Sequence, residues 1–92
     1  MNLLRIETEP PHNGIQRMAV SGRLDTESHA SLDEALDPLL ADEHVQSVVL
    51  DLGELNYIST DGVRSIFRAR RALAASRRRV LVVNPQPQVQ KV

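Results

Sequence analysis

The stretch VVLDLGELNYISTDGVRSIFRARRAL, residues 48–73, places a β-branched apolar run before a polar turn and an amphipathic segment. The run VQSVVLDL, residues 45–52, is typical of an interior strand that is buried on both faces. We expect GELN, residues 53–56, to form a turn. Apolar side chains then recur at helical spacing and predict a helix over residues 60–76. Strand and helix in this order indicate half of a βαβ unit.

Two strands and another helix are expected before this stretch. LLRIET (residues 3–8) and IQRMAVSG (residues 15–22) are typical of short strands, and the prolines, Asn13 and Gly14 between them suit a hairpin connection. Between residues 22 and 44, apolar side chains recur at the spacing of a helix with one buried face: Leu32, Ala35, Leu36, Leu39 and Leu40. Asp25, Thr26 or Ser28 could cap its first turn. Pro38 removes a backbone donor, so we expect a kink or a tightened last turn there.

A last apolar run, VLVV at residues 80–83, predicts another strand. Because a helix lies between two strands twice over, the sequence predicts an α/β fold with right-handed crossovers and parallel inner strands. A chain of 92 residues has room for one small domain with one core. We expect that core to include Leu36, Val49, Leu50, Ile66 and Phe67.

Composition excludes several kinds of site. The chain has no cysteine, so disulfides, thiolate metal sites and cysteine nucleophiles are excluded. His12, His29 and His44 lack metal-like spacing and are expected to be solvated surface residues, the four glycines are isolated, and Ser59 lacks the elbow motif of hydrolases. We therefore predict no enzyme activity, no metal and no cofactor. Neither a signal peptide nor a membrane span is recognisable, so a cytoplasmic protein is expected.

Charge is divided unevenly along the chain. Residues 1–63 hold all twelve acidic side chains and three arginines, whereas residues 64–92 hold seven arginines, one lysine and no acid. Such a division can mark an end that binds nucleic acid or membranes. We favour the alternative that both parts lie side by side and partly neutralise each other, because Tyr57 and Phe67 are the only aromatic residues. We predict no nucleic-acid partner and no membrane insertion.

The polar turn of Ser59, Thr60, Asp61 and Gly62 lies where partners most often meet an open α/β sheet. One interpretation is structural: Ser59 or Thr60 caps the helix, Asp61 complements its dipole and Gly62 permits close packing. A regulatory role is compatible with this, because the helix N-terminus stabilises an added phosphate while the surface seen by a partner changes.

Three segments in order resemble the STAS domain, the family of bacterial anti-sigma-factor antagonists. Residues 48–73 resemble its central signature, residues 21–36 (SGRLDTESHASLDEAL) its G-x-L-D segment, and residues 77–92 (RRRVLVVNPQPQVQKV) its following strand and next helix. The resemblance implies a single STAS-like domain over residues 1–92, with a small mixed sheet, helices mainly on one face and no catalysis. It also implies that the family's C-terminal strand and helix are lacking.

The resemblance further implies that an anti-sigma factor or serine kinase of the histidine-kinase-like ATPase type binds and phosphorylates the turn. The hydroxyl most often modified in the family precedes the glycine, where this chain has Asp61. We predict Thr60 as the acceptor and Ser59 as the second choice; alternatively, Asp61 supplies a permanent charge. Asp25, which matches the aspartate of G-x-L-D, is expected beside the turn and Gly62.

Helical spacing predicts an exposed stripe of Arg64, Arg68 and Arg71 that recognises an acidic partner. Two other functions stay open, namely the STAS subunit of a bacterial lipid-asymmetry ABC transporter and a STAS domain from an anion transporter or a larger signalling protein. The apolar strand at residues 80–83 predicts self-association, as a two-fold dimer through residues 80–92, unless the chain is a fragment of a monomeric parent.

Overall fold

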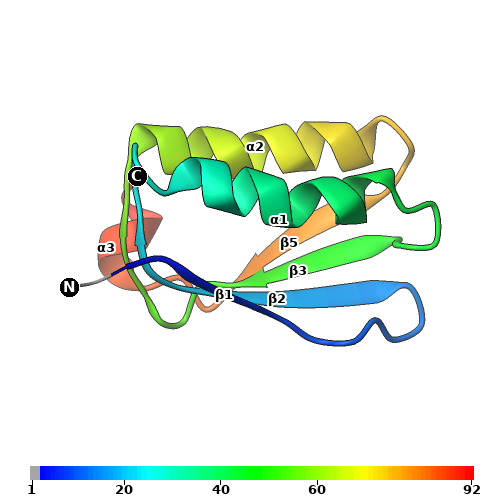
Figure 1. Ribbon diagram of the computed structural model, residues 1–92, viewed down its shortest axis with the longest axis horizontal. Coiled ribbons are helices and arrows are strands. Elements are labelled where there is room, and N and C mark those ends of the chain that lie inside the picture. Colours follow the sequence, from blue (N-terminus) through cyan, green and yellow to red (C-terminus); the bar gives the residue numbers. More distant parts are fainter. Residues whose placement is uncertain (1–2) are drawn as a thin grey trace.

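A five-stranded sheet carries two long helices, which lie side by side over one of its faces (Figure 1). The computed structural model describes residues 3–92. Its strands are β1 (Arg5–Thr8), β2 (Ile15–Leu24), β3 (Ser47–Asp51), β4 (Leu55–Ile58) and β5 (Arg79–Val83). Its helices are α1 (His29–Ala41), α2 (Thr60–Ala74) and the single turn α3 (Pro87–Gln90). The predicted helices and the four predicted strands are all present.

The sheet runs in the order β1-β2-β3-β5, and β4 pairs with the end of β2. β1 is antiparallel to β2, whereas the β2–β3, β3–β5 and β2–β4 pairs are parallel. The prediction of an α/β fold with a mixed sheet and parallel inner strands is therefore confirmed.

The strand β4 corrects the prediction of a turn over residues 53–56. Only Gly53 and Glu54 form a turn, and the extended chain resumes at Leu55. Leu55 and Ile58 are buried, and β4 pairs with Gly22–Leu24 across a register shift, since Gly22 pairs with Leu55 but Arg23 pairs with Tyr57. Gly22 has a φ of +87°, which glycine adopts freely, so β2 can bend there to reach β4.

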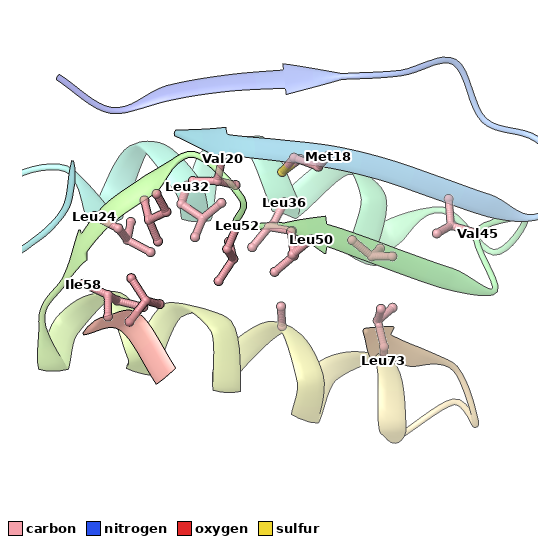
Figure 2. Packing of buried hydrophobic residues seen from close by; sticks show 14 residues of the cluster. Met18, Val20, Leu24, Leu32, Leu36, Val45, Leu50, Leu52, Ile58 and Leu73 are labelled. Atoms are coloured by element: carbon pink, nitrogen blue, oxygen red, sulfur yellow. The ribbon is translucent and has the colours of Figure 1, made fainter. Parts of the chain in front are cut away.

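The core lies between the sheet and the two long helices, and Figure 2 shows its side chains meeting between these layers. Leu36 and Leu50 are fully buried as predicted. Val49 and Ile66 are only half-buried, and Phe67 is 49% exposed, so the prediction of a buried Phe67 was wrong. The buried face of α2 consists of small residues and one leucine: Gly62, Ser65, Ala69 and Leu73. A hydrophobicity pattern does not identify such small residues as the buried face of a helix. Because they face the sheet and let α2 lie close to it, Phe67 lies on the outer side of the helix.

The opposite face of the sheet is open, so the prediction that β3 is buried on both faces was also wrong. Val49 on β3 lies between Arg17 on β2 and Leu81 on β5 in the strand register. Leu81 is 43% exposed, and Ile15 on the same face is 46% exposed. The helices cover only the other face of the sheet, which explains the half-buried Val49.

The end of α1 is tightened, as Pro38 predicted. The N–H of Asp42 donates to the carbonyl of Leu39, three residues back, at 3.3 Å. The guanidinium of Arg78 donates to the carbonyls of Leu40, Asp42 and Val45 at 2.8–3.0 Å. A cation in this position satisfies free carbonyls and complements the negative end of the helix dipole.

Candidate partner-binding site

Ser59 caps the helix α2 and ties the turn to the sheet. Its side-chain Oγ accepts the N–H of Gly62 at 3.2 Å, and its backbone N–H donates to the carbonyl of Leu24 at 2.9 Å. Ser59 is half-buried, whereas Thr60, the first residue of α2, is exposed. The two candidate hydroxyls therefore differ: one belongs to the cap, and the other lies on a surface residue.

Gly62 allows the first turn of α2 to rest directly on the ends of β2 and β4. A Cβ at this position would lie 2.7 Å from Leu24 Cγ, 2.9 Å from Ile58 Cγ1 and 2.9 Å from the carbonyl oxygen of Leu24. Figure 2 shows Leu24 and Ile58 at the end of the core where α2 begins. The close approach predicted for Gly62 is present, and it fixes the position of the turn.

Asp25 lies beside the turn because Leu24 and Ile58 are register partners in the parallel β2–β4 pair. Its Oδ1 accepts the amides of Glu27 at 3.1 Å and Ser28 at 3.0 Å. A hydrogen bond from the hydroxyl of Ser28 is the main cause that lowers the pKa of Asp25, and these amides add to it against the effect of burial. Ser28 is the N-cap of α1, but no side-chain cap bond forms there, so the predicted capping of the first turn is not observed; Asp25 instead fixes the turn that precedes α1.

Arg23 and Tyr57 contact each other beside Asp25, and neither residue was predicted from the sequence as part of the site. The guanidinium of Arg23 lies 4.0 Å from the centre of the Tyr57 ring, a cation–π contact, and its Nε lies 3.7 Å from Asp25 Oδ2. Only the register of β2 with β4 brings these residues together. Since β4 was not predicted as a strand, the sequence offered no signal for this pair.

The predicted arginine stripe on α2 divides into two parts. Arg68 binds the carboxylates of α1, with Nε 3.2 Å from Asp33 Oδ1 and a terminal nitrogen 2.8 Å from Asp37 Oδ1. The Asp37 hydrogen bond, with the charge of Asp33, raises the pKa of Arg68 although burial opposes this. Arg64 and Arg71 are exposed.

Phe67 lies among these arginines on the outer side of α2. With Arg64, Arg68 and Arg71 it lines a shallow pocket. Arg64 also lies 3.8 Å from Asp61, one turn earlier. The structure therefore combines part of the predicted stripe with an aromatic side chain that was predicted to be in the core.

His29 lies near the turn and is half-buried, contrary to the expectation of a solvated residue. Its Nδ1 lies 3.3 Å from Ser65 Oγ and 3.6 Å from Asp33 Oδ2. A serine–histidine–aspartate triad needs the two ring nitrogens to face different partners. Here one nitrogen faces both, so this group does not form a nucleophilic triad.

The part of the chain that the structure describes contains no group of three or more histidine and acidic side chains placed to hold a metal ion. Between residues 3 and 92, moreover, no helix has the length and apolar character needed to cross a bilayer. The distinctive features of the site are thus an exposed hydroxyl residue, a fixed carboxylate and a basic aromatic surface.

The STAS domain family model matches residues 10–92, so the chain belongs to the STAS domain family. A sequence comparison with curated proteins gives no match. The anti-sigma factor antagonist SpoIIAA in its unphosphorylated form has a similar structure, with a TM-score of 0.80 and 18% identity over 95% of this chain and 79% of that chain. The phosphorylated form of SpoIIAA from Bacillus gives a TM-score of 0.79 at the same 18% identity, over 95% of this chain and 78% of that chain.

Two further structures show how widely the fold occurs. An anti-sigma factor antagonist from Mycobacterium paratuberculosis has a TM-score of 0.80 and 23% identity over 95% of this chain and 74% of that chain. The murine anion transporter Slc26a9 has a TM-score of 0.76 and 12% identity over 89% of this chain, which spans 14% of that chain. At these identities the likeness shows the fold alone.

Proposed function

We propose that this chain is a bacterial anti-sigma-factor antagonist, a non-catalytic regulator that acts in the cytoplasm. In its unmodified form it binds an anti-sigma factor, or a related serine kinase of the histidine-kinase-like ATPase type, and so frees a sigma factor. The exposed Thr60 at the start of α2, in a chain of the STAS family, is the observation that carries the proposal. The structural likeness to two anti-sigma factor antagonists supports it.

Thr60 is the proposed phosphorylation site. The Oγ of Ser59 already accepts the N–H of Gly62, and Ser59 is half-buried, so a kinase reaches Thr60 more readily. A phosphate adds about −1.5 to −2 charges at pH 7. The free amides and dipole at the start of α2 stabilise that charge, so the helix persists while the surface changes.

The phosphate weakens partner binding through its surroundings. Asp61 follows Thr60 directly, and Asp25 lies on the neighbouring strand end. A doubly charged phosphate joins these carboxylates to make a strongly negative corner. An acidic partner surface that binds the arginines of α2 is then repelled by the phosphate. Binding would also require the phosphate to be dehydrated, which is costly.

The partner contacts the outer side of α2 as well as the turn. Phe67 is a large exposed apolar side chain beside Arg64 and Arg71, and aromatic and arginine residues contribute most to many interfaces. Replacing Arg64 and Arg71 by glutamate should slow association and reduce its dependence on salt. Arg68 belongs to the proposed surface, but its bonds to α1 make it unsuitable for this test.

The test is a phosphorylation assay with purified serine kinases of this ATPase type from the source organism, each incubated with the chain and ATP. We expect one kinase to label the wild type, and phosphopeptide mapping to find the label on Thr60. Thr60→Ala should abolish labelling, whereas Thr26→Ala, a change at another exposed threonine, should not. Labelling of Ser59 alone would contradict the acceptor assignment.

Absence of labelling by every kinase would favour the alternative in which Asp61 is a permanent charge, provided that one kinase binds the chain. Absence of both binding and labelling would contradict the proposed function. Co-purification with the ATPase subunit of a lipid transporter would instead indicate the STAS subunit of a lipid-asymmetry ABC transporter. Recovery of the chain within a membrane transporter or a larger signalling protein would indicate the other alternative.

A further inference from the structure

The outer edge of β5 has free backbone groups. β5 is the last strand in the order β1-β2-β3-β5, and within residues 3–92 no strand pairs with its outer side. On the side of β3, Arg79 donates and Val83 accepts backbone hydrogen bonds of 3.2 and 3.0 Å. Because inward and outward peptide groups alternate along a paired strand, the N–H and C=O groups of Val80 and Val82 point outward.

This edge is apolar, unlike the other edge of the sheet. Leu81 is 43% exposed on the open face, and Val82 is 41% exposed on the helix side. The edge strand β1 instead carries Arg5 and Glu7, whose side chains pair at 3.0 Å. Charged edge strands resist pairing with another chain, whereas an apolar edge promotes it.

We propose that a second copy of this chain pairs with β5 in antiparallel orientation, about a two-fold axis at Leu81. In this register Val80 of each copy faces Val82 of the other, and their outward groups make four backbone hydrogen bonds. Leu81 faces Leu81 of the other copy on the open face, so the two sheets become one. The proposal does not depend on the proposed function.

Charge favours this orientation. Antiparallel pairing moves the arginines of residues 77–79 in the two copies to opposite ends of the interface, whereas parallel pairing would place them together. Arg79 then lies opposite Val83 of the other copy, and Val83 is the register partner of Asp51. Each Arg79 therefore faces an apolar side chain and not the arginine of the other copy. A partner strand with the same sequence and reversed direction fits this edge.

The register can be tested by cross-linking, because the chain has no cysteine of its own. In a directly opposed pair without backbone hydrogen bonds, the Cα atoms lie about 4.5 Å apart, within the range of a disulfide. Leu81→Cys should therefore form a covalent dimer under mild oxidation. Val83→Cys is the matched control: the two positions are offset by four residues, about 14 Å, which is beyond the limit of about 7 Å.

Sedimentation of the unmodified chain over a range of concentrations tests the association itself. A small interface predicts a weak dimer that forms at high concentration. Leu81→Lys should shift the dissociation constant at least tenfold upward, because two like charges would face each other. Ile15→Lys, an equally exposed site on the same face but away from the edge, should leave it unchanged.

Circular dichroism of each variant checks that the monomer folds. A wild-type chain that remains monomeric at the highest concentration overturns the proposal, and so does equal cross-linking of both cysteine variants. A dimer weakened by Ile15→Lys but not by Leu81→Lys would place the interface on the open face and would also refute pairing at the edge.

Discussion

Gly62→Ala should destabilise the protein although alanine is a better helix former than glycine. The added Cβ would lie 2.7 Å from Leu24 Cγ, which the leucine side chain can relieve by moving. It would also lie 2.9 Å from the carbonyl oxygen of Leu24, which belongs to the backbone of β2 and is fixed by the N–H of Ser59. Overpacking of a core site costs about 1–3 kcal/mol.

Helix propensity opposes this cost, because alanine is favoured over glycine in a helix by about 1 kcal/mol. We therefore expect the free energy of unfolding to fall by about 1 kcal/mol, within a range of about 0–2 kcal/mol, taking these two magnitudes together. Denaturant unfolding followed by circular dichroism measures it. Ala72→Gly, at an exposed site within α2, calibrates the propensity term alone. If Gly62→Ala stabilises the protein by as much as Ala72→Gly destabilises it, α2 does not press on β2 as described.

Substitutions at three other sites have definite expectations. Leu36→Ala should cost about 2–5 kcal/mol in unfolding experiments, whereas Phe67→Ala at a half-exposed site should cost less than about 1 kcal/mol; equal costs would contradict the orientation of α2. Ser59→Ala removes the cap of α2 and should cost about 1 kcal/mol, most of which Ser59→Asp should restore in the same assay.

The N–H of Gly53 is the main cause that lowers the pKa of Asp51, with help from Asn84 and Arg17. The carboxylate of Asp51 therefore contributes to stability above its ordinary pKa of 3.8, and this contribution is lost as the pH falls through its lower pKa in the folded protein. Acid should consequently destabilise the wild type more than it destabilises Asp51→Asn.

The pattern of apolar residues was sufficient to predict a helix or a strand wherever that pattern extended over the whole segment. The leucines of α1 recur over the whole helix, and β3 and β5 are runs of β-branched and apolar residues between polar connections. Their alternation along the chain predicted the parallel order. The position of the turn followed as well, because an N-cap residue and a glycine precede an amphipathic run.

Two features could not be predicted because they depend on contacts between distant segments. β4 has four residues, two of them exposed, and it is extended because it pairs with the bent end of β2. The direction of Phe67 depends on the small residues that face the sheet, since Gly62 and Ala69 allow close packing where a larger side chain would not. Both errors affect the candidate site, since β4 positions Tyr57 and the orientation of α2 exposes Phe67.

The uneven charge of the chain is partly resolved inside the fold, and this determines which arginines remain available to a partner. Arg68 is held by Asp33 and Asp37, and Arg78 is held by the carbonyls at the end of α1. Both connect the basic second half of the chain to the acidic first half. Substitution of either arginine should therefore disturb the contacts of α1 and not only the charge of the surface. Arg71 is exposed on α2, so its charge acts mainly outward, towards a partner.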